Sequence, residues 1–415
     1  DSRFWASGQL NFIFQTHPDF PAKYSGPNSL HSQYEKATSR VLTLFLGLRL
    51  SDSTAVMVDV EETGGRGISD ALGVAGFTNL DVVRNPSIGQ APYLARVMFH
   101  HIFALSSEKQ EADRDPFHIF STLPVRRLEF RAGKFGTADF FDQNSIGSDS
   151  HSQFLNWTAD NNGAYDYAAD TRGYTWGAIL DYEQKTWGLR FGELLMPKVA
   201  NGINIEWNLR RAHAENVEFE LRRNFLPKRG GTLRLLGYSN AANMGIYRLQ
   251  NERYLAGLDP TPVITNHPLQ KTRKFGFGAN FEQSLNSYVK AFGRFGWNNG
   301  KTESYAYTEV DQSVELGAGL DGSRWHRKFD KAGAVFVSNA IAKDHQFYLQ
   351  HGGLGFLLGD GNLHYGHENI FESFYNAHLW KGLYGGLDLQ HINNPGYNRD
   401  RGPVLVPGVR LHIEL

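Results

Sequence analysis

The 415-residue chain has no cysteine, almost no net charge and no long apolar run. Without cysteine it holds neither a disulfide scaffold nor a cysteine-ligated metal or iron–sulfur centre. A net charge of -1 argues against a nucleic-acid partner, which would need a basic face. The most apolar stretch, 41–50, is interrupted by Thr43, Gly47 and Arg49, so nothing reaches the ~18 apolar residues of a membrane-spanning helix. The first residues lead directly into patterned sequence without a signal peptide, so if the protein is exported, we expect this to be its mature form.

What the sequence does contain is alternation of apolar and polar residues with a period of two. Leucine stands at every even position of the segment 42–50. The same alternation recurs in 4–15, in 173–184, where the apolar face begins at Tyr174, and in 404–415. Successive side chains of a strand point to opposite faces, so these segments are predicted strands with one apolar and one polar face.

Two architectures produce such alternation. A soluble sandwich turns the apolar face inward, whereas a membrane barrel turns it into lipid and keeps polar residues around a lumen. Strands of globular proteins have about 5–6 residues, but a tilted lipid-spanning strand needs about 9–11. The charged face of Arg127, Glu129 and Arg131 suits a wet lumen better than a packed core. The pattern predicts an all-β fold, a transmembrane antiparallel β-barrel, with Glu129 inward and Phe130 outward.

Turn spacing predicts sixteen strands with both termini on the rim that carries short turns. Tight reversals at 51–53, 183–186 and 284–287 alternate with long loops, as in outer-membrane barrels. Strands are expected at 3–15, 40–51, 53–62, 94–105, 125–135, 173–184, 186–195, 214–224, 231–241, 274–284, 287–298, 313–321, 331–340, 371–380, 383–392 and 404–415. A hairpin at Asp360-Gly361 would raise the total to eighteen; the poor alternation of 351–356 favours a loop and sixteen.

Several stretches resemble a known family. They are Gly-Lys-Phe-Gly-Thr-Ala-Asp-Phe-Phe-Asp at 133–142, Phe-Leu-Asn-Trp at 154–157, Asp-Tyr-Ala-Ala-Asp-Thr-Arg-Gly-Tyr-Thr-Trp-Gly at 166–177, Gly359-Asp360-Gly361 with Glu368, Glu372 and Tyr375, and the tail 390–403. Together they resemble the carbohydrate-selective outer-membrane porins of OprB type. The resemblance implies a sixteen-stranded barrel in the bacterial outer membrane that passes small solutes, usually sugars. Two points depart from a simple match: the chain ends in Leu415, where such barrels commonly end in Phe, and the branch of the family that this tail resembles includes members assigned to metal-ion uptake.

Enzyme and metal chemistry find little support in the sequence. It contains neither G-x-S-x-G nor H-E-x-x-H, so we predict no enzyme. His100 and His101 are adjacent in a strand and face opposite sides, so they cannot chelate together. A loop would have to bring His364 and His367 together with Glu368. We therefore predict no metal site and no cofactor.

The channel interior carries the strongest functional signal. A sixteen-stranded barrel leaves an aqueous channel, so we predict that two long loops, 63–93 and 136–172, fold inward within a single 1–415 barrel domain. The first is expected to carry a short capped helix over 69–75. The predicted pore-lining residues are Glu61, Arg84, Arg96, Arg127, Glu129, Arg131, Asp139, Asp142, Trp157, Asp170 and Arg172.

This mixture of side chains suits sugars. Arginine donates and carboxylates accept hydrogen bonds with hydroxyl groups, and an indole such as Trp157 stacks on a pyranose. The alternative for each residue is that it only anchors a loop to the wall. Expected partners are small solutes, outer-membrane lipid and lipopolysaccharide, and the barrel is a monomer or homotrimer. A porin tuned to divalent metal ions, a barrel enzyme and a soluble sugar-binding β-protein are the competing hypotheses.

Overall fold

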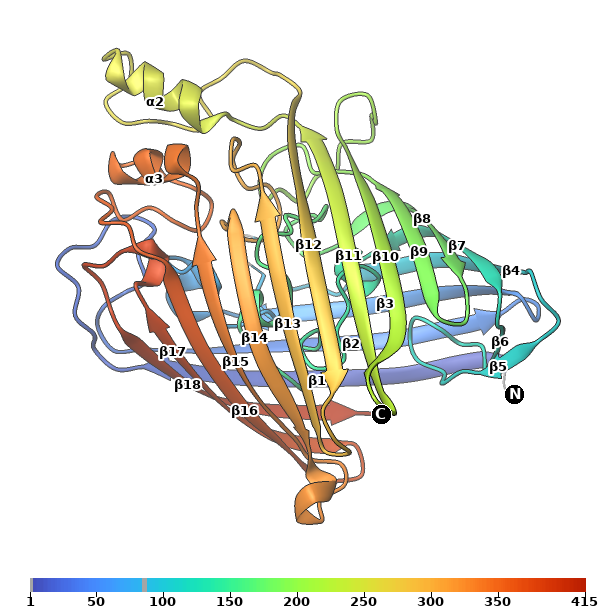
Figure 1. The fold of residues 1–415 in the computed structure, drawn as a ribbon. Helices are drawn as coiled ribbons and strands as arrows, with labels where there is room; N and C mark the ends of the chain where they lie inside the picture. Colours follow the sequence, from blue (N-terminus) through green and yellow to red (C-terminus); the bar gives the residue numbers. More distant parts are fainter. Residues whose placement is uncertain (1–2, 84–87) are drawn as a thin grey trace.

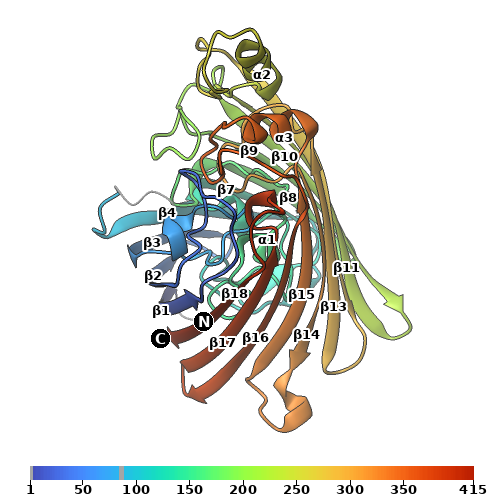
Figure 2. The ribbon, with the colours of Figure 1, turned by 90° about the vertical axis from the view of Figure 1, so that its left-hand side faces the viewer.

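Sixteen strands close into one antiparallel barrel in the computed structural model, which describes residues 3–83 and 88–415 (Figures 1 and 2). Strands adjacent in sequence pair, except that β4 pairs with β7 and β1 closes the ring against β18. The barrel strands are β1 (Phe4–His17), β2 (Glu35–Arg49), β3 (Thr54–Gly65), β4 (Tyr93–Ala104), β7 (Arg127–Phe135), β8 (Thr175–Glu183), β9 (Trp187–Leu194), β10 (His213–Leu226), β11 (Arg229–Ala242), β12 (Thr272–Ser284), β13 (Val289–Asn298), β14 (Gln312–Asp321), β15 (Lys331–Ala340), β16 (Glu368–Trp380), β17 (Leu383–Asn393) and β18 (Val404–Glu414).

The predicted sixteen-stranded fold is confirmed. Expected strand bounds hold to within three residues, apart from β2, which begins at Glu35 and not at residue 40. The region 341–370 adds no strand to the barrel; it holds the helix α3 (Lys343–Gln350) and loop. The alternative of eighteen strands is therefore wrong.

Alternate side chains face lipid and interior, as the period of two requires. On β2 the leucines at the even positions of 42–48 are exposed on the outside, whereas Val41, Thr43 and Phe45 between them are buried. On β12, Phe275 is exposed and Lys274 is fully buried. The apolar faces thus form the outer surface that a bilayer requires.

The two rims differ, as predicted, with one exception. Long loops gather at the end that carries α2 (Tyr247–Leu255) and α3, and both termini lie at the opposite end (Figure 1). On the terminus-bearing rim, the segment 105–126 between β4 and β7 is long, where the turn pattern predicted short reversals. It contains the small sheet of β5 (Lys109–Glu111) and β6 (Thr122–Pro124). Its Phe120 is buried against His100 of β4, with ring centroids 5.5 Å apart.

The described parts of the two long loops, 63–83 and 136–172, pack inside the barrel. Phe154 is fully buried, and its ring lies 4.9 Å from that of Phe374 on β16 and 5.9 Å from that of Phe292 on β13. Apolar side chains of both loops and of the wall belong to one buried cluster. Close packing of this kind fixes a loop as firmly as a core element, so a large part of the barrel interior is filled by protein.

Helices in the interior and on the rims are short. α1 (Trp157–Asp160) is capped by the Asn156 side chain, which accepts from the amide of Thr158 at 3.0 Å. The remaining helical turns are η1 (Ile68–Ala71), η2 (Thr137–Asp139), η3 (Gly322–Trp325) and η4 (Pro395–Tyr397). None of the described helices is long and apolar enough to cross a membrane.

The capped helix predicted over 69–75 is wrong. The segment forms only the turn η1, without a side-chain cap, and φ is positive at Ser69, Asp70 and Ala71. The carboxylate of Glu35 on β2 accepts from the Ser69 amide at 3.0 Å and from its hydroxyl at 2.8 Å. These tertiary hydrogen bonds replace the local capping that the sequence suggested.

Candidate functional site

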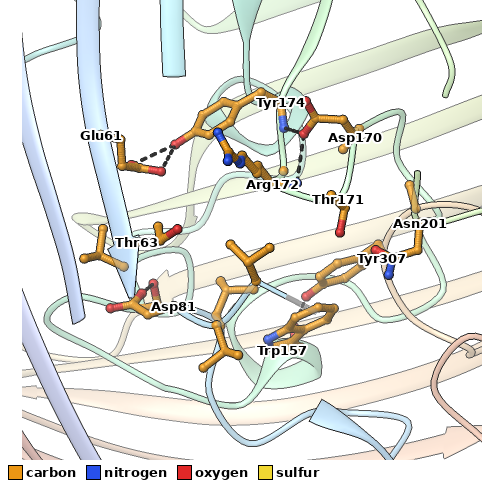
Figure 3. A pocket seen from close by; sticks show the side chains of 18 of the residues that line it. Glu61, Thr63, Asp81, Trp157, Asp170, Thr171, Arg172, Tyr174, Asn201 and Tyr307 are labelled. Carbon is orange, nitrogen blue, oxygen red and sulfur yellow. Dashed lines mark hydrogen bonds between the residues drawn. The ribbon is translucent and has the colours of Figure 1, made fainter. Parts of the chain in front are cut away.

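Two adjoining cavities run through the part of the interior that the loops leave free. The larger, about 940 Å³, is lined at the terminus-bearing end by Trp5, Gly382 and Leu415. The smaller, about 160 Å³, lies among the long-loop segments beside Asn201 and Tyr307 (Figure 3). The two cavities have lining residues in common, so together they lead from one end of the barrel towards the other.

The residues shared by both cavities define what we call the junction. Its members come from β3 and from the two inward loops, with Tyr174 at the entry to β8. They are Glu61, Leu80, Ser150, His151, Tyr167, Arg172, Gly173 and Tyr174. The junction brings together two residues of the predicted site, Glu61 and Arg172.

Glu61 on β3 is held by a set of hydroxyl groups. The Tyr174 hydroxyl donates to its carboxylate at 2.9 Å (Figure 3). The Thr43 hydroxyl donates to it at 3.1 Å, and the Tyr93 hydroxyl donates as well. The guanidinium of Arg172 lies over the Tyr93 ring, 3.8 Å from its centroid. A carboxylate acceptor and a guanidinium donor therefore share the tyrosine between them, and both reach the junction.

Arg172 is placed by a tight turn that Asp170 organises. The Asp170 carboxylate accepts from the backbone amides of Arg172 at 2.9 Å and of Tyr174 at 3.2 Å. Such side-chain-to-backbone bonds fix a turn without a regular element. Asp170 is almost fully buried, and this burial raises the pKa of its carboxyl group. Asp170 lines the smaller cavity and also holds the turn.

Across the junction lies a second group of charges, which sequence reasoning missed. His151 is 3.6 Å from a carboxylate oxygen of Asp81 and 3.6 Å from one of Asp149. His151 belongs to a loop and not to a strand. Although burial opposes protonation, these two carboxylates raise the pKa of its imidazole to about 9. The imidazole is therefore a cation at neutral pH, and the junction carries charges of both signs.

Arg96 and Asp139 face the larger cavity as a pair. Two guanidinium nitrogens of Arg96 donate to the two oxygens of Asp139 at 2.7 Å each, and a third lies 3.3 Å from Asp59. The guanidinium also packs over the ring of Phe117, 4.7 Å from its centroid. Phe117 belongs to the segment 105–126, so this pair joins the inward loop, the wall and the terminus-bearing rim.

Arg127, Glu129 and Arg131 lie on the inner face of β7 but line neither cavity. All three are buried. Glu129 accepts from Arg127 at 2.6 Å, lies 2.8 Å from Nε2 of His100, and also accepts from Arg131. The inward direction predicted for Glu129 holds, but the residue belongs to a closed ion-pair network and does not face the passage.

Asp142 and Trp157 serve the packing of the inward loop. Asp142 is buried and pairs with Arg294 of β13 at 3.0 Å. Trp157 donates to the carbonyl oxygen of Asn79 at 3.0 Å and stacks on Tyr307, with centroids 5.6 Å apart. It lines the smaller cavity, yet Tyr307 covers one face of the indole that was predicted to meet a sugar (Figure 3). Arg84 lies outside the described residues.

Two missed anchors sit on β16. Glu368 accepts from the amides of Ala75 and Gly76, in the first inward loop, at 3.0 and 2.9 Å. Glu372 accepts from the amides of Leu155 and Asn156 in the second loop. Both glutamates were quoted for the resemblance; Glu372 falls in the polar phase of the predicted strand 371–380, whereas Glu368 lies three residues before it. Their partners lie more than 200 residues away in sequence, which no local pattern reveals.

Metal ligation has no geometric basis here. Within residues 3–83 and 88–415, no group of three or more histidine, aspartate or glutamate side chains is arranged to hold an ion. His364 pairs with Asp400 at 2.5 Å, while His367 contacts Ser338 at 3.2 Å. The two histidines do not combine with Glu368, which is occupied by loop amides. Nothing supports the alternative of a metal-ion porin.

A closed sixteen-stranded barrel with an apolar outer face, an interior narrowed by inward loops and a charged passage defines an outer-membrane porin. The family model of the carbohydrate-selective porins, OprB family, matches residues 42–415, and the chain belongs to this family. It is therefore a bacterial outer-membrane channel for sugars, in agreement with the resemblance of its motifs.

Comparison with solved structures agrees on the fold. The high-pH structure of OprB from Pseudomonas putida superposes with a TM-score of 0.73 at 14% identity, covering 99% of this chain and 94% of that one. The outer-membrane channel DcaP of Acinetobacter baumannii gives a TM-score of 0.52 at 9% identity, covering 99% and 97%. Comparison with curated protein sequences gives no match.

Proposed function

We propose that sugars cross the barrel by passive diffusion through the two adjoining cavities, and that the junction is the selective narrowing. The supporting observation is that Glu61 and Arg172 meet there around one tyrosine, with His151 and Asp81 nearby. A sugar hydroxyl both donates and accepts, so a guanidinium and a carboxylate together satisfy it. Charges of both signs give no strong preference for one ion sign, unlike a ring of one charge.

In this proposal the loops 63–93 and 136–172 form the constriction of a single barrel domain, and the chain catalyses no reaction. The loops are anchored by buried carboxylates, and such anchors would keep the junction residues at fixed spacing. Weak contacts of several kinds suit a channel because the solute must also leave. The subunit number, one or three, stays a prediction that native mass spectrometry in detergent would decide.

The test is block of ion current by sugar. Single channels in planar bilayers would be titrated with glucose and with maltotriose. We expect Arg172→Gln to weaken the block by about tenfold, since a hydrogen bond to a charged group contributes roughly 1.5–3 kcal/mol. Arg126→Gln is the matched control, because Arg126 is exposed on the rim and lines neither cavity. Equal block in both variants, or no block of the unmodified channel by either sugar, would contradict the proposal.

A further inference from the structure

A basic hollow lies at the long-loop rim of the barrel, where the segment between β9 and β10 meets the residues that precede β12. Its volume is about 340 Å³. The charged residues that line it are Lys198, Arg210, Arg211, Lys271 and Glu206. Four basic side chains thus face one acidic side chain, although the chain as a whole is nearly neutral.

The cations of this hollow are largely unneutralised. Arg211 lies 4.0 Å from Glu206, at the limit of an ion pair. The ammonium group of Lys271 donates to the carbonyl oxygen of Arg210 at 2.9 Å, which draws these two residues together. Within the described part of the chain, no carboxylate forms an ion pair with Lys198, Arg210 or Lys271. These basic side chains are exposed to the surroundings of the barrel.

The hollow borders the apolar band that faces lipid. On β12 the outward side chains towards this rim are Phe277, Phe275 and Arg273, and Lys271 stands two residues before Arg273, just ahead of the strand. Trp207 lies against the outward-facing Trp176 of β8, with ring centroids 5.5 Å apart. Tryptophan marks the interface between the hydrocarbon and headgroup regions. The basic residues therefore lie at headgroup depth on the long-loop side.

Apolar side chains next to the hollow are unusually exposed. Trp207 is 64% exposed, Leu209 47% and Leu269 81%. They flank the basic residues instead of packing into the barrel. A ligand that fits this surface has an anionic head for the hollow and hydrocarbon chains for the apolar flank.

We propose that this hollow binds the phosphate groups of a phosphorylated glycolipid of the outer leaflet. Arginine forks bind phosphate bidentately, and lysine binds it as a point charge. Basic pockets at the edge of a membrane-spanning region bind lipid headgroups in the same way. The hollow lies on the outer side of the barrel, away from the junction, so this inference does not depend on the proposed sugar path.

The test compares lipid binding by matched variants. Purified protein in detergent would be titrated with diphosphoryl lipid A and analysed by native mass spectrometry. The variant R210Q/R211Q/K271Q removes three charges from the hollow, and R223Q/K228Q/R229Q removes three exposed charges from the opposite rim. We expect the first to weaken binding at least tenfold and the second to leave it unchanged. R210Q/R211Q, which keeps the Lys271 contact, should lie between them if the triple variant folds poorly.

Three results would overturn the proposal. Equal binding by the two triple variants would show that lipid attaches without the hollow. Equal binding of lipid A and of its dephosphorylated form, or displacement of lipid A by millimolar inorganic phosphate, would remove the phosphorylated glycolipid as the specific ligand. A change in subunit number in R210Q/R211Q would assign the surface to a second copy of the chain.

Discussion

The carboxylate of Glu368 on β16 accepts a hydrogen bond from the backbone amide of Gly76 at 2.9 Å, and both residues are buried. The same carboxylate accepts from Ala75 at 3.0 Å and from Gly396 at 2.7 Å. One side chain of the wall thus holds the first inward loop and the loop before the last strand. Buried charges of this barrel are therefore satisfied by loop amides as well as by opposite charges.

Loss of this anchor should widen the passage. In Glu368→Gln the three amides lose a charged acceptor, and each such bond contributes roughly 1.5–3 kcal/mol. We expect a folded barrel whose open-channel current is larger and noisier, because the loop 63–93 is released from the wall. Single-channel recording measures the current, and heat-modifiable gel mobility reports the folded barrel.

Glu62→Gln is the control for this change. Glu62 lies next to the junction residue Glu61, but its side chain pairs with Arg40 at 2.7 Å and faces outward. It should keep the conductance of the unmodified channel. An unchanged current in Glu368→Gln, or equal effects of the two substitutions, would show that the anchor does not control the width.

Glu129→Gln should impair stability more than conductance. The sequence predicts Glu129 as an inward, pore-lining residue; the structure buries it between Arg127, Arg131 and His100, away from both cavities. Removing one member of a buried charge network costs roughly 3–5 kcal/mol. Urea unfolding from lipid vesicles measures this loss, with the exposed Glu108→Gln as control. A variant with normal stability and altered conductance would show that Glu129 lines the passage after all.

The barrel could be predicted from the sequence because apolar and polar residues alternate with a period of two. A strand with one face in lipid and one in the interior must alternate, so strand number, strand bounds and the outward direction of Phe130 followed from local pattern. The exception at Tyr174 is informative: it continues the apolar phase of 173–184, yet β8 begins at Thr175 and Tyr174 turns inward to Glu61. The alternating pattern therefore predicts whether a side chain points to lipid or to the interior only for residues within the strand itself.

The interior was less readable, because its contacts join distant segments. The length of loops 63–93 and 136–172 predicted that they fold inward, and their acidic and basic residues were predicted to lie in the barrel interior. Which of them face the passage depends on partners such as Arg294 for Asp142 or Asp139 for Arg96. A charge satisfied by a partner on a remote strand is an anchor, and the sequence does not reveal such pairs.

Ion selectivity should change at alkaline pH because of His151. Asp81 and Asp149 raise its pKa to about 9, while Glu61 and His412 also face it. With the folded pKa above the unfolded value near 6.5, the charge stabilises the fold fully below about pH 6.5, and this contribution is lost as the pH rises through about 9. The junction then loses a cation, so cation permeability should increase between about pH 8 and 10. Reversal potentials under a salt gradient measure the change.

His151→Gln separates this residue from other groups that titrate in the same range. The variant has no charge to lose at position 151, so its selectivity at neutral pH should already resemble that of the unmodified channel at pH 10, and the alkaline step should be absent. A step of the same size in His151→Gln would assign the titration to another group of the channel.

Phe130→Arg tests whether the apolar side chains of the strands face lipid and the polar side chains face the channel. Phe130 faces outward near the middle of β7, between the registers of His101 on β4 and Leu180 on β8, and its ring lies 6.5 Å from that of Phe99. An arginine at bilayer depth on the lipid face should cost about 2–4 kcal/mol of folding free energy. Phe329→Arg is the control, because Phe329 is exposed and lies in the rim segment beyond η3. Denaturant unfolding from vesicles of both variants should show a large loss for Phe130→Arg and little for Phe329→Arg. Equal losses would mean that Phe130 does not meet hydrocarbon, and the inward assignment of its neighbours Glu129 and Arg131 would fail with it.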